Sequence, residues 1–406
     1  MELNYTARKY LFTAITVIIG TILVFAGTRV FRTDYTKKTI NVGFIYMGDQ
    51  SNFYTNNFYR SQMELEATFD NVKTIAKYNI PENREVVNYA LYDLVSKGCN
   101  LIFTTSYGYS KAAKQFAAEH PNVQICQATG NNANEIPFVP NYHTFMGRIY
   151  EGRYISGVVA GMKLLDLIQK DMVPRSNAKI GYIGAYPSAE VISGYTAFFL
   201  GVRSIVPEAI MTVRYTDTWN NYITEKKCAE KLIYEDNCVI ISQHSDTTGP
   251  ASACEVAHTK KGKIVYHVGY NQSMTDIAPK TSLVSCRINW TPYVCAATEA
   301  VLKEKKIESV VKATIRGTDS GGGISQQWVE MIGLNKVIAA LGTEAEIEHL
   351  AKQFKDGEIT VFKGSYIGVN PYNHNDTWDL RTPYPENSIA SAPGFTYVLK
   401  DVIEVK

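Results

Sequence analysis

Polar and aromatic side chains gather in the short turns that follow apolar runs of this sequence. These turns read GDQSNFY at 48–54, SYGY at 106–109, GAYP at 184–187, QHSDT at 243–247 and GYN at 269–271. Carboxylates and amides exchange hydrogen bonds, and aromatic rings offer flat faces for stacking. Such turns predict a binding wall for a small, flat, polar molecule. The candidate residues are Asp49, Asn52, Phe53, Tyr54, Ser106, Tyr107, Tyr186, Trp219, His244, Asp246, Tyr270, Asn271 and Trp290.

Two of these candidates allow a second interpretation. Trp219 follows a strand-like run, and Trp290 lies in INWTPY, so either ring could pack in a core or stack on a ligand. Phe53 and Tyr54 stand in a turn rich in Gly, Asn and Ser that offers little packing around them, which favours ligand stacking.

Motifs for catalysis or metal binding are missing from the sequence. There is no GxxxxGK[ST] phosphate loop and no HExxH zinc motif. His244, Ser245 and Asp246 are adjacent in one turn, whereas a catalytic triad needs three groups that converge in space. The seven cysteines show none of the paired spacings of zinc or redox sites, and any disulfide among them is unassigned. We therefore expect no metal, no cofactor and no catalytic residue.

The elements that must position these turns alternate between strands and helices, which is typical of βαβ units and a parallel sheet. The carboxyl ends of parallel strands open on one edge of the sheet, where ligands bind. The predicted strands are 40–47, 72–78, 100–106 and 123–129, then 178–185, 210–217, 238–245 and 263–270.

Because the series occurs twice, the sequence predicts an α/β protein with two Rossmann-like lobes joined by a multi-strand hinge. An apolar helix rich in small residues, 150–165, marks the seam. We expect lobe 1 to comprise 39–150 and about 271–340, and lobe 2 to comprise 151–270 and about 341–406. The facing edges of the two lobes would then form a cleft.

The N-terminal segment predicts export. An uncharged run from Tyr10 to Gly27 follows Arg8 and Lys9, and its roughly 18 residues fit either a signal peptide cleaved after Ala26 or a membrane anchor. A buried helix is the alternative interpretation. The chain carries 41 basic and 39 acidic residues, a net charge of +2, which argues against a nucleic-acid binder.

Six strings are informative together: GRIYEGRYISGVVAG (147–161), KIGYIGAYPSAEVISGYTAFFLGVRSIVPEA (179–209), TDTW (216–219), SQHSDTTGP (242–250), APKTSLVSCRINWTPYV (278–294) and FKGSYIG (362–368). In this order they resemble the basic membrane protein family, which comprises substrate-binding proteins of ABC importers. The resemblance covers about residues 40–400 and implies a type I periplasmic-binding fold. It also implies capture of a purine base or nucleoside, with Asp49, Phe53, Tyr54, Ser106, Tyr107, Trp219, Asp246 and Asn271 as the matching site residues. Asn271 stands where nucleoside-binding relatives carry an aspartate.

The resemblance implies an extracytoplasmic, monomeric receptor that delivers its ligand to an ABC permease. Two alternatives stay open: a membrane-anchored sensor with the same fold, which an uncleaved 10–27 segment would favour, and a nucleoside-hydrolysing enzyme.

Overall fold

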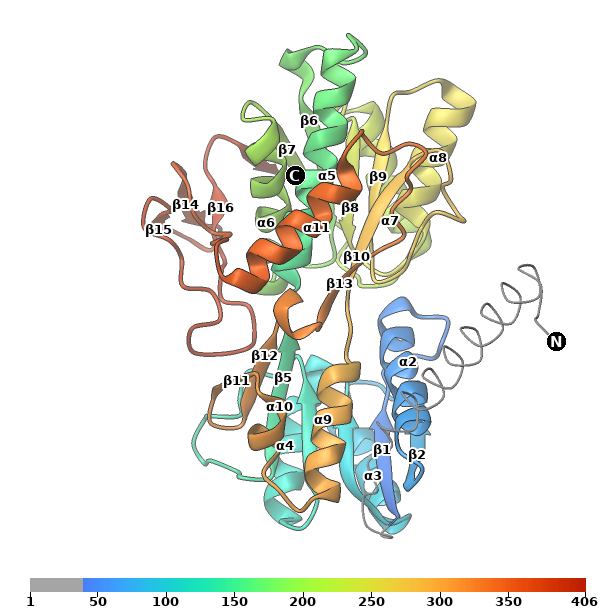
Figure 1. The fold of residues 1–406 in the computed structure, drawn as a ribbon, viewed down its shortest axis with the longest axis vertical. Helices are drawn as coiled ribbons and strands as arrows, with labels where there is room; N and C mark the ends of the chain where they lie inside the picture. The colour runs from blue at the N-terminus through green and yellow to red at the C-terminus, as the bar shows by residue number, and fades with distance from the viewer. Residues whose placement is uncertain (1–38) are drawn as a thin grey trace, which may run out of the picture.

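A computed structural model of the chain describes residues 39–406, which form two lobes stacked along the long axis of the molecule (Figure 1). The predicted signal or anchor segment, 10–27, lies outside the described residues. Among residues 39–406, no helix is long and apolar enough to span a membrane.

The first lobe is built on a seven-stranded sheet in the order β11-β12-β5-β4-β3-β1-β2. Its strands are parallel except for the β11–β12 pair. In register, Ile45 lies opposite Thr104, and Thr104 lies opposite Gln127, so β1, β3 and β4 end side by side. The strands are β1 (Ile40–Ile45), β2 (Val72–Lys77), β3 (Cys99–Thr104), β4 (Gln124–Ala128), β5 (Tyr142–Gly147), β11 (Thr314–Arg316) and β12 (Asp319–Gly322).

The second lobe repeats this plan with the order β13-β10-β9-β8-β6-β7-β17. Only β13 is antiparallel to its neighbour. Gly184 lies opposite both Tyr215 and His244, so β6, β7 and β8 also end at one edge. The strands are β6 (Lys179–Gly184), β7 (Ile210–Tyr215), β8 (Ile240–His244), β9 (Tyr266–Tyr270), β10 (Ser282–Ile288), β13 (Val329–Ile332) and β17 (Ile403–Val405).

Helices cover both sheets, and their apolar faces form the cores of the lobes. The helix predicted at the seam is α5, and it packs closely on α6. A side chain at Gly157 would lie 1.9 Å from the Phe198 carbonyl oxygen, and one at Gly201 would lie 2.2 Å from the Tyr154 carbonyl oxygen. Only glycine permits so close an approach of the two backbones. The helices are α2 (Phe53–Thr68), α3 (Arg84–Ser96), α4 (Ser110–Glu119), α5 (Ile149–Gln169), α6 (Ala189–Ile205), α7 (Tyr222–Tyr234), α8 (Gly249–Lys261), α9 (Thr291–Leu302), α10 (Ile307–Val311) and α11 (Thr343–Asp356), with short 3-10 turns η1 (Tyr107–Tyr109), η2 (Arg175–Asn177) and η3 (Ile324–Gln326).

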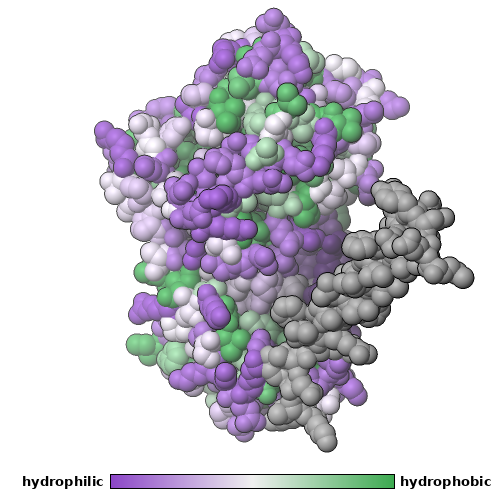
Figure 2. Space-filling model, in the orientation of Figure 1, coloured by the Kyte–Doolittle hydropathy of each residue, from purple (hydrophilic) through white to green (hydrophobic). Residues whose placement is uncertain are grey.

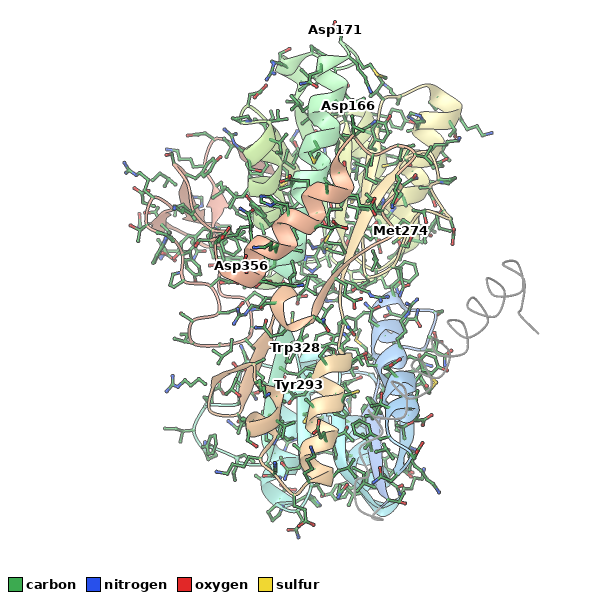
Figure 3. All side chains as sticks on the ribbon, viewed as in Figure 1. Asp166, Asp171, Met274, Tyr293, Trp328 and Asp356 are labelled. Atoms are coloured by element: carbon green, nitrogen blue, oxygen red, sulfur yellow. The ribbon has the colours of Figure 1, made fainter. Side chains whose placement is uncertain are left out.

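Three chain segments connect the lobes: β5 to α5, β10 to α9, and β12 through η3 to β13. They pack on one another without room for larger residues, since a side chain at Gly147 would lie 2.7 Å from Ile288 and one at Gly152 would lie 2.7 Å from Val329. Figure 3 shows Trp328 and Tyr293 together at the top of the first lobe, where their ring centroids are 5.4 Å apart. The connection is therefore a three-segment hinge, and the packed rings of Tyr293 and Trp328 lie where it meets the first lobe.

A small third sheet, β15-β14-β16, lies against the side of the second lobe (Figure 1). Its strands are β14 (Ile367–Asn370), β15 (Asn373–Asp379) and β16 (Val398–Leu399). Between β15 and β16, the segment 385–395 reaches the first lobe, where Ser391 donates to Asp319 through its backbone N–H and its hydroxyl, both at 2.6 Å. We call this segment the strap.

The prediction of two α/β lobes with parallel sheets is confirmed. The lobe boundaries differ from those expected. The sequence places about 271–340 in lobe 1, but β10 pairs with β9, and β13 pairs with β10, so both belong to the second sheet. The chain therefore returns to the first lobe after Ile288 and leaves it again after Gly322. All seven cysteines are unpaired, and five of them are buried.

Candidate ligand-binding site

A cavity of about 110 Å³ lies between the two lobes, at the facing edges of their sheets. Met47, Ser106 and Thr129 each follow the end of a strand in the first sheet, as Asp246 and Asn271 do in the second. The aligned strand ends explain why residues distant in sequence meet here. The lining residues are Met47, Tyr54, Glu82, Ser106, Tyr107, Thr129, Glu190, Trp219, Asp246, Tyr270 and Asn271.

Tyr54 forms the aromatic part of the first-lobe wall. It stands in the first turn of α2, and its hydroxyl donates to the Thr105 carbonyl oxygen at 2.5 Å. Its ring meets the edges of Phe58 and Trp290 at 5.3 and 6.3 Å. Trp290 itself is completely buried and stacks on Phe58 at 4.4 Å. The indole therefore belongs to the core behind the wall, where it supports Tyr54.

Glu82 adds a carboxyl group to the same wall. It accepts hydrogen bonds from the Ser106 hydroxyl and from the Gly108 backbone N–H, the latter at 2.9 Å. A side chain at Gly108 would overlap the Glu82 carboxyl group at 2.3 Å, so glycine is required for this contact. Ser106 is thus oriented by Glu82 as it faces the cavity.

The second-lobe wall consists of Trp219 and Tyr270, with further rings behind them. Trp219 contacts Tyr186 at 5.8 Å and His244 at 6.1 Å. The Arg153 guanidinium lies over the Tyr270 ring, 3.9 Å from the ring centroid. This arrangement is a cation–π contact within a buried environment. It holds the Tyr270 ring against the cavity.

Asp246 and Asn271 form the polar centre of the second-lobe wall. Asn271 donates from Nδ2 to Asp246 Oδ1 at 2.8 Å, and its Oδ1 accepts from Asn57 of α2 at 3.0 Å. Asn271 has φ +63°, a conformation that asparagine adopts more readily than most residues. Because Asn57 belongs to the first lobe, the chain of amides links the two lobes at the cavity.

His244 lies behind the lining and is fully buried. Its Nε2 is 3.4 Å from Glu190 Oε1. Burial, together with the positive charge of Arg153, lowers the pKa of His244 to about 4. The ring is therefore neutral at neutral pH and brings no positive charge to the cavity.

The structure brings seven of the thirteen candidate residues to the cavity lining. The seven lining residues are Tyr54, Ser106, Tyr107, Trp219, Asp246, Tyr270 and Asn271. The other six lie outside the lining: Asp49, Asn52, Phe53, Tyr186, His244 and Trp290. Whether each of the thirteen binds a ligand stays a prediction.

The residues outside the lining have identifiable surroundings. Asp49 lies in an exposed turn and accepts from the Ser51 hydroxyl at 2.6 Å and from the Ser51 N–H at 2.9 Å, and these two bonds lower its pKa. Asn52 caps α2 by accepting from the Thr55 N–H. Phe53 packs on Ala251, Met274 and Ala278 of the second lobe; Figure 3 places Met274 in the upper lobe.

Sequence reasoning missed four lining residues: Met47, Glu82, Thr129 and Glu190. Met47 and Thr129 stand just past the ends of β1 and β4. Their position after a predicted strand could therefore have identified them as lining candidates. Glu190 lies in the first turn of α6, and Glu82 lies two residues before α3. Within residues 39–406, no group of three or more His, Cys, Asp or Glu is placed to hold a metal ion.

Two parallel-sheet lobes, a three-segment hinge and a cavity between the strand ends define a two-lobed ligand-binding protein. Two solved solute-binding proteins of ABC transporter systems share this fold. The one from Conexibacter woesei has a TM-score of 0.61 at 14% identity, covering 79% of this chain and 98% of that one. The one from Aeropyrum pernix has a TM-score of 0.60 at 15% identity, covering 83% and 95%.

Sequence comparison identifies the family. The profile of the Bmp family, described as ABC transporter substrate-binding protein PnrA-like, matches residues 40–361, and the chain belongs to this family. A purine-binding protein of Brucella abortus is 29% identical over 345 residues, which cover 84% of this chain and 87% of that protein. A putative ABC transporter glucose-binding protein of Haloferax volcanii is 29% identical over 266 residues, covering 66% and 60%.

The family assignment confirms the predicted function at this level. The chain is an ABC-transporter substrate-binding protein, which binds a small molecule and serves an ABC transporter. Substrate-binding proteins of ABC importers work outside the cytoplasm.

Proposed function

We propose that this protein captures a purine base or nucleoside in the inter-lobe cavity and delivers it to an ABC permease. One observation carries the proposal: the rings of Tyr54, Trp219 and Tyr270 line the same small space as the paired polar groups of Asp246 and Asn271. Rings suit the faces of a flat heterocycle, and carboxyl and amide groups suit its edges. The purine-binding relative from Brucella abortus supports the same ligand class.

The three-segment hinge supplies the movement that this function needs. In the open state the ligand would bind one lobe, and closure would bring the other wall against it. In the structure the lobes are already joined beside the cavity by the Asn57–Asn271 hydrogen bond. Ligand entry therefore requires this bond to open, and the bound ligand is enclosed when the bond forms again.

Affinity and selectivity would come from different residues. A stacking contact contributes about 0.5–1.5 kcal/mol beyond the area it buries. A ligand that cannot pair with Asp246 or Asn271 leaves a buried polar group unsatisfied, which costs about 1–3 kcal/mol. The aromatic residues would therefore set how tightly a base binds, and the polar residues would set which base is preferred.

The mature protein would act as a monomer outside the cytoplasm, either released or held by segment 10–27, and it would not convert its ligand. The family's role supports the extracytoplasmic and non-enzymatic parts of this proposal, and the sequence of the N-terminal segment supports export. Mass measurement of the protein purified from its native membrane fraction would show whether the chain is cut after Ala26. Release of free base from adenosine or guanosine during incubation would contradict the non-enzymatic role.

A fluorescence titration tests the proposed ligand class. Adenine, guanine, adenosine and guanosine are added separately to the purified protein, and tryptophan emission is recorded. Trp219 is the tryptophan that lines the cavity, so we expect a saturable change for at least one of the four. Trp219→Phe should remove this change, while calorimetry of the same variant still detects binding. A wild-type protein that gives neither fluorescence change nor heat with any of the four would overturn the assignment.

A further inference from the structure

Among residues 39–406, three acidic side chains and no basic one line the cavity. Glu82 comes from the first lobe, and Glu190 and Asp246 come from the second. The other eight lining residues are uncharged at neutral pH. A ligand enclosed here meets carboxyl groups supplied by both walls.

The nearby cationic group is separated from the cavity by a ring. Arg153 is fully buried, lies 3.9 Å from the centroid of Tyr270, and donates from Nη1 to the Gln243 carbonyl oxygen at 2.7 Å. Tyr270 itself lines the cavity, so its ring stands between the guanidinium and the ligand space. His244 is neutral, as described above. The described residues therefore offer no positively charged group in the cavity to a phosphate, a carboxylate or a deprotonated ring.

The carboxyl groups keep accepting capacity for a ligand. Asn271 donates to Oδ1 of Asp246, and in the described part of the chain the second oxygen, Oδ2, is left to whatever enters the cavity. Glu82 uses Oε1 for both Ser106 and Gly108, which holds the group in place but engages only one of its two oxygens. Each remaining oxygen accepts hydrogen bonds and cannot donate them while ionised.

From this arrangement, and on the basis of the proposed function, we infer that the ligand is an amino-bearing heterocycle, neutral or cationic, that presents several N–H donors to Glu82, Glu190 and Asp246. An exocyclic amine or a protonated ring nitrogen gives each carboxylate a donor, and charge-assisted hydrogen bonds of this kind are roughly twice as strong as neutral ones. An oxo group at the same place sets one lone pair against another and leaves a buried carboxylate unpaired. The cavity thus selects by charge and by donor count.

The test compares pairs of bases that differ by amino and oxo groups. Dissociation constants are measured by calorimetry at pH 8 for adenine against hypoxanthine, 2,6-diaminopurine against xanthine, and cytosine against uracil. We expect the amino member of each pair that binds to bind at least about 10-fold more tightly, the effect of one unpaired buried group.

The outcomes separate this inference from the proposed function. Oxo bases that bind as tightly as their amino partners overturn the inference and leave the purine function standing. Binding of cytosine without any purine overturns the purine function and supports the inference. Silence from all six bases, and from guanine, adenosine and guanosine as well, overturns both.

Two conservative variants test the assigned residues. Glu82→Gln keeps an oxygen for Ser106 and Gly108 but removes the charge, and we expect it to reduce the adenine-to-hypoxanthine preference by about 10-fold. Glu190→Gln should also reduce the adenine-to-hypoxanthine preference. It replaces Glu82→Gln as the test variant if Glu82→Gln folds poorly. Glu348→Gln, on the exposed side of α11, is the matched control and should leave the preference unchanged. Variants that fold normally, judged by their melting temperatures, and keep the full preference would overturn the inference.

Discussion

Asp246 is a carboxylic acid in surroundings that disfavour its charge. Its side chain is 8% exposed. Burial raises its pKa to about 7, and the negative charges of Glu225 and Glu190 add to the effect, whereas the hydrogen bond from Asn271 and the charge of Arg153 oppose it. Tyr54 and Tyr270 complete the titratable groups around it. Asp246 is therefore about half ionised near pH 7 in the ligand-free protein.

This titration predicts a pH-dependent affinity for amino-bearing bases. Only the ionised form of Asp246 accepts hydrogen bonds at both oxygens, and its population rises from about one tenth at pH 6 to about nine tenths at pH 8. The dissociation constant for adenine should therefore fall by up to about 10-fold between pH 6 and pH 8. Calorimetric titrations at pH 6, 7 and 8 measure it, and Asp246→Asn should flatten the profile. A constant that is unchanged or rises with pH would contradict the role assigned to this carboxyl group.

Three of the lining residues found by sequence follow strand ends directly, whereas the four that were missed do not share one pattern. Ser106, Asp246 and Asn271 stand one or two residues past a buried strand, where the parallel arrangement dictates a common edge. Glu82 and Glu190 lie beside helix starts, in sequence that equally suits a solvated helix end. Only the three-dimensional meeting of the lobes distinguishes these acids from ordinary surface residues.

At the scale of elements, alternation of apolar runs and amphipathic stretches predicts eight of the fourteen strands in the two large sheets, β1 to β4 and β6 to β9. It could not assign β10 and β13, because an apolar run such as SLVSCRI reads the same whichever sheet it joins. The third sheet and the strap were also not predicted. Their sequence contains many aromatic and polar residues without regular period, and their contacts are made with residues far away in the chain.

The strap offers a test of an element that lies outside the matched family region of 40–361. Asp319 accepts from the Ser391 N–H and hydroxyl and from the Thr144 hydroxyl, and its side chain is buried. Asp319→Ala leaves three donors without their acceptor, which should lower the free energy of unfolding by about 1–3 kcal/mol.

Urea denaturation of this variant, followed by circular dichroism, measures the loss. The matched control is Asp379→Ala, because Asp379 is half-exposed and pairs with Arg381 at the surface, a contact worth about 0–1 kcal/mol. Equal stability of the two variants would show that the strap adds nothing to the fold.

At the scale of the whole molecule, closure depends on contacts between α2 and the second lobe. Asn57 donates to Asn271, Arg60 donates to Gln272 at 3.3 Å, and Phe53 packs against Met274. The three α2 residues, Phe53, Asn57 and Arg60, stand beside the cavity and not in its lining, although Asn271 lines it. On the face of the molecule shown in Figure 2, the surface over α11 is mainly hydrophilic. The contact of Phe53 with Met274, by comparison, is apolar.

Removal of the inter-lobe amide contact should weaken the closed state without altering the wall. Asn57→Ala is expected to speed ligand dissociation by about 5- to 10-fold, corresponding to the roughly 1 kcal/mol of one hydrogen bond. Stopped-flow fluorescence with the ligand identified by titration measures the rate. Asn56→Ala, one residue earlier on α2, is the control and should dissociate like the wild type. Identical rates for both variants would show that closure does not depend on this contact.

The amide of Asn271 has a consequence for how ligand preference can evolve. Its carbonyl oxygen and its NH₂ group each already make one hydrogen bond, the oxygen with Asn57 and the NH₂ group with Asp246. A residue that replaces Asn271 to suit a different heterocycle would also have to keep the hydrogen bond to Asn57 that joins the two lobes. Few side chains can do both. New ligand specificities are therefore more accessible by mutation at Thr129 or Tyr107, because changes there would keep the Asn57–Asn271 hydrogen bond between the lobes.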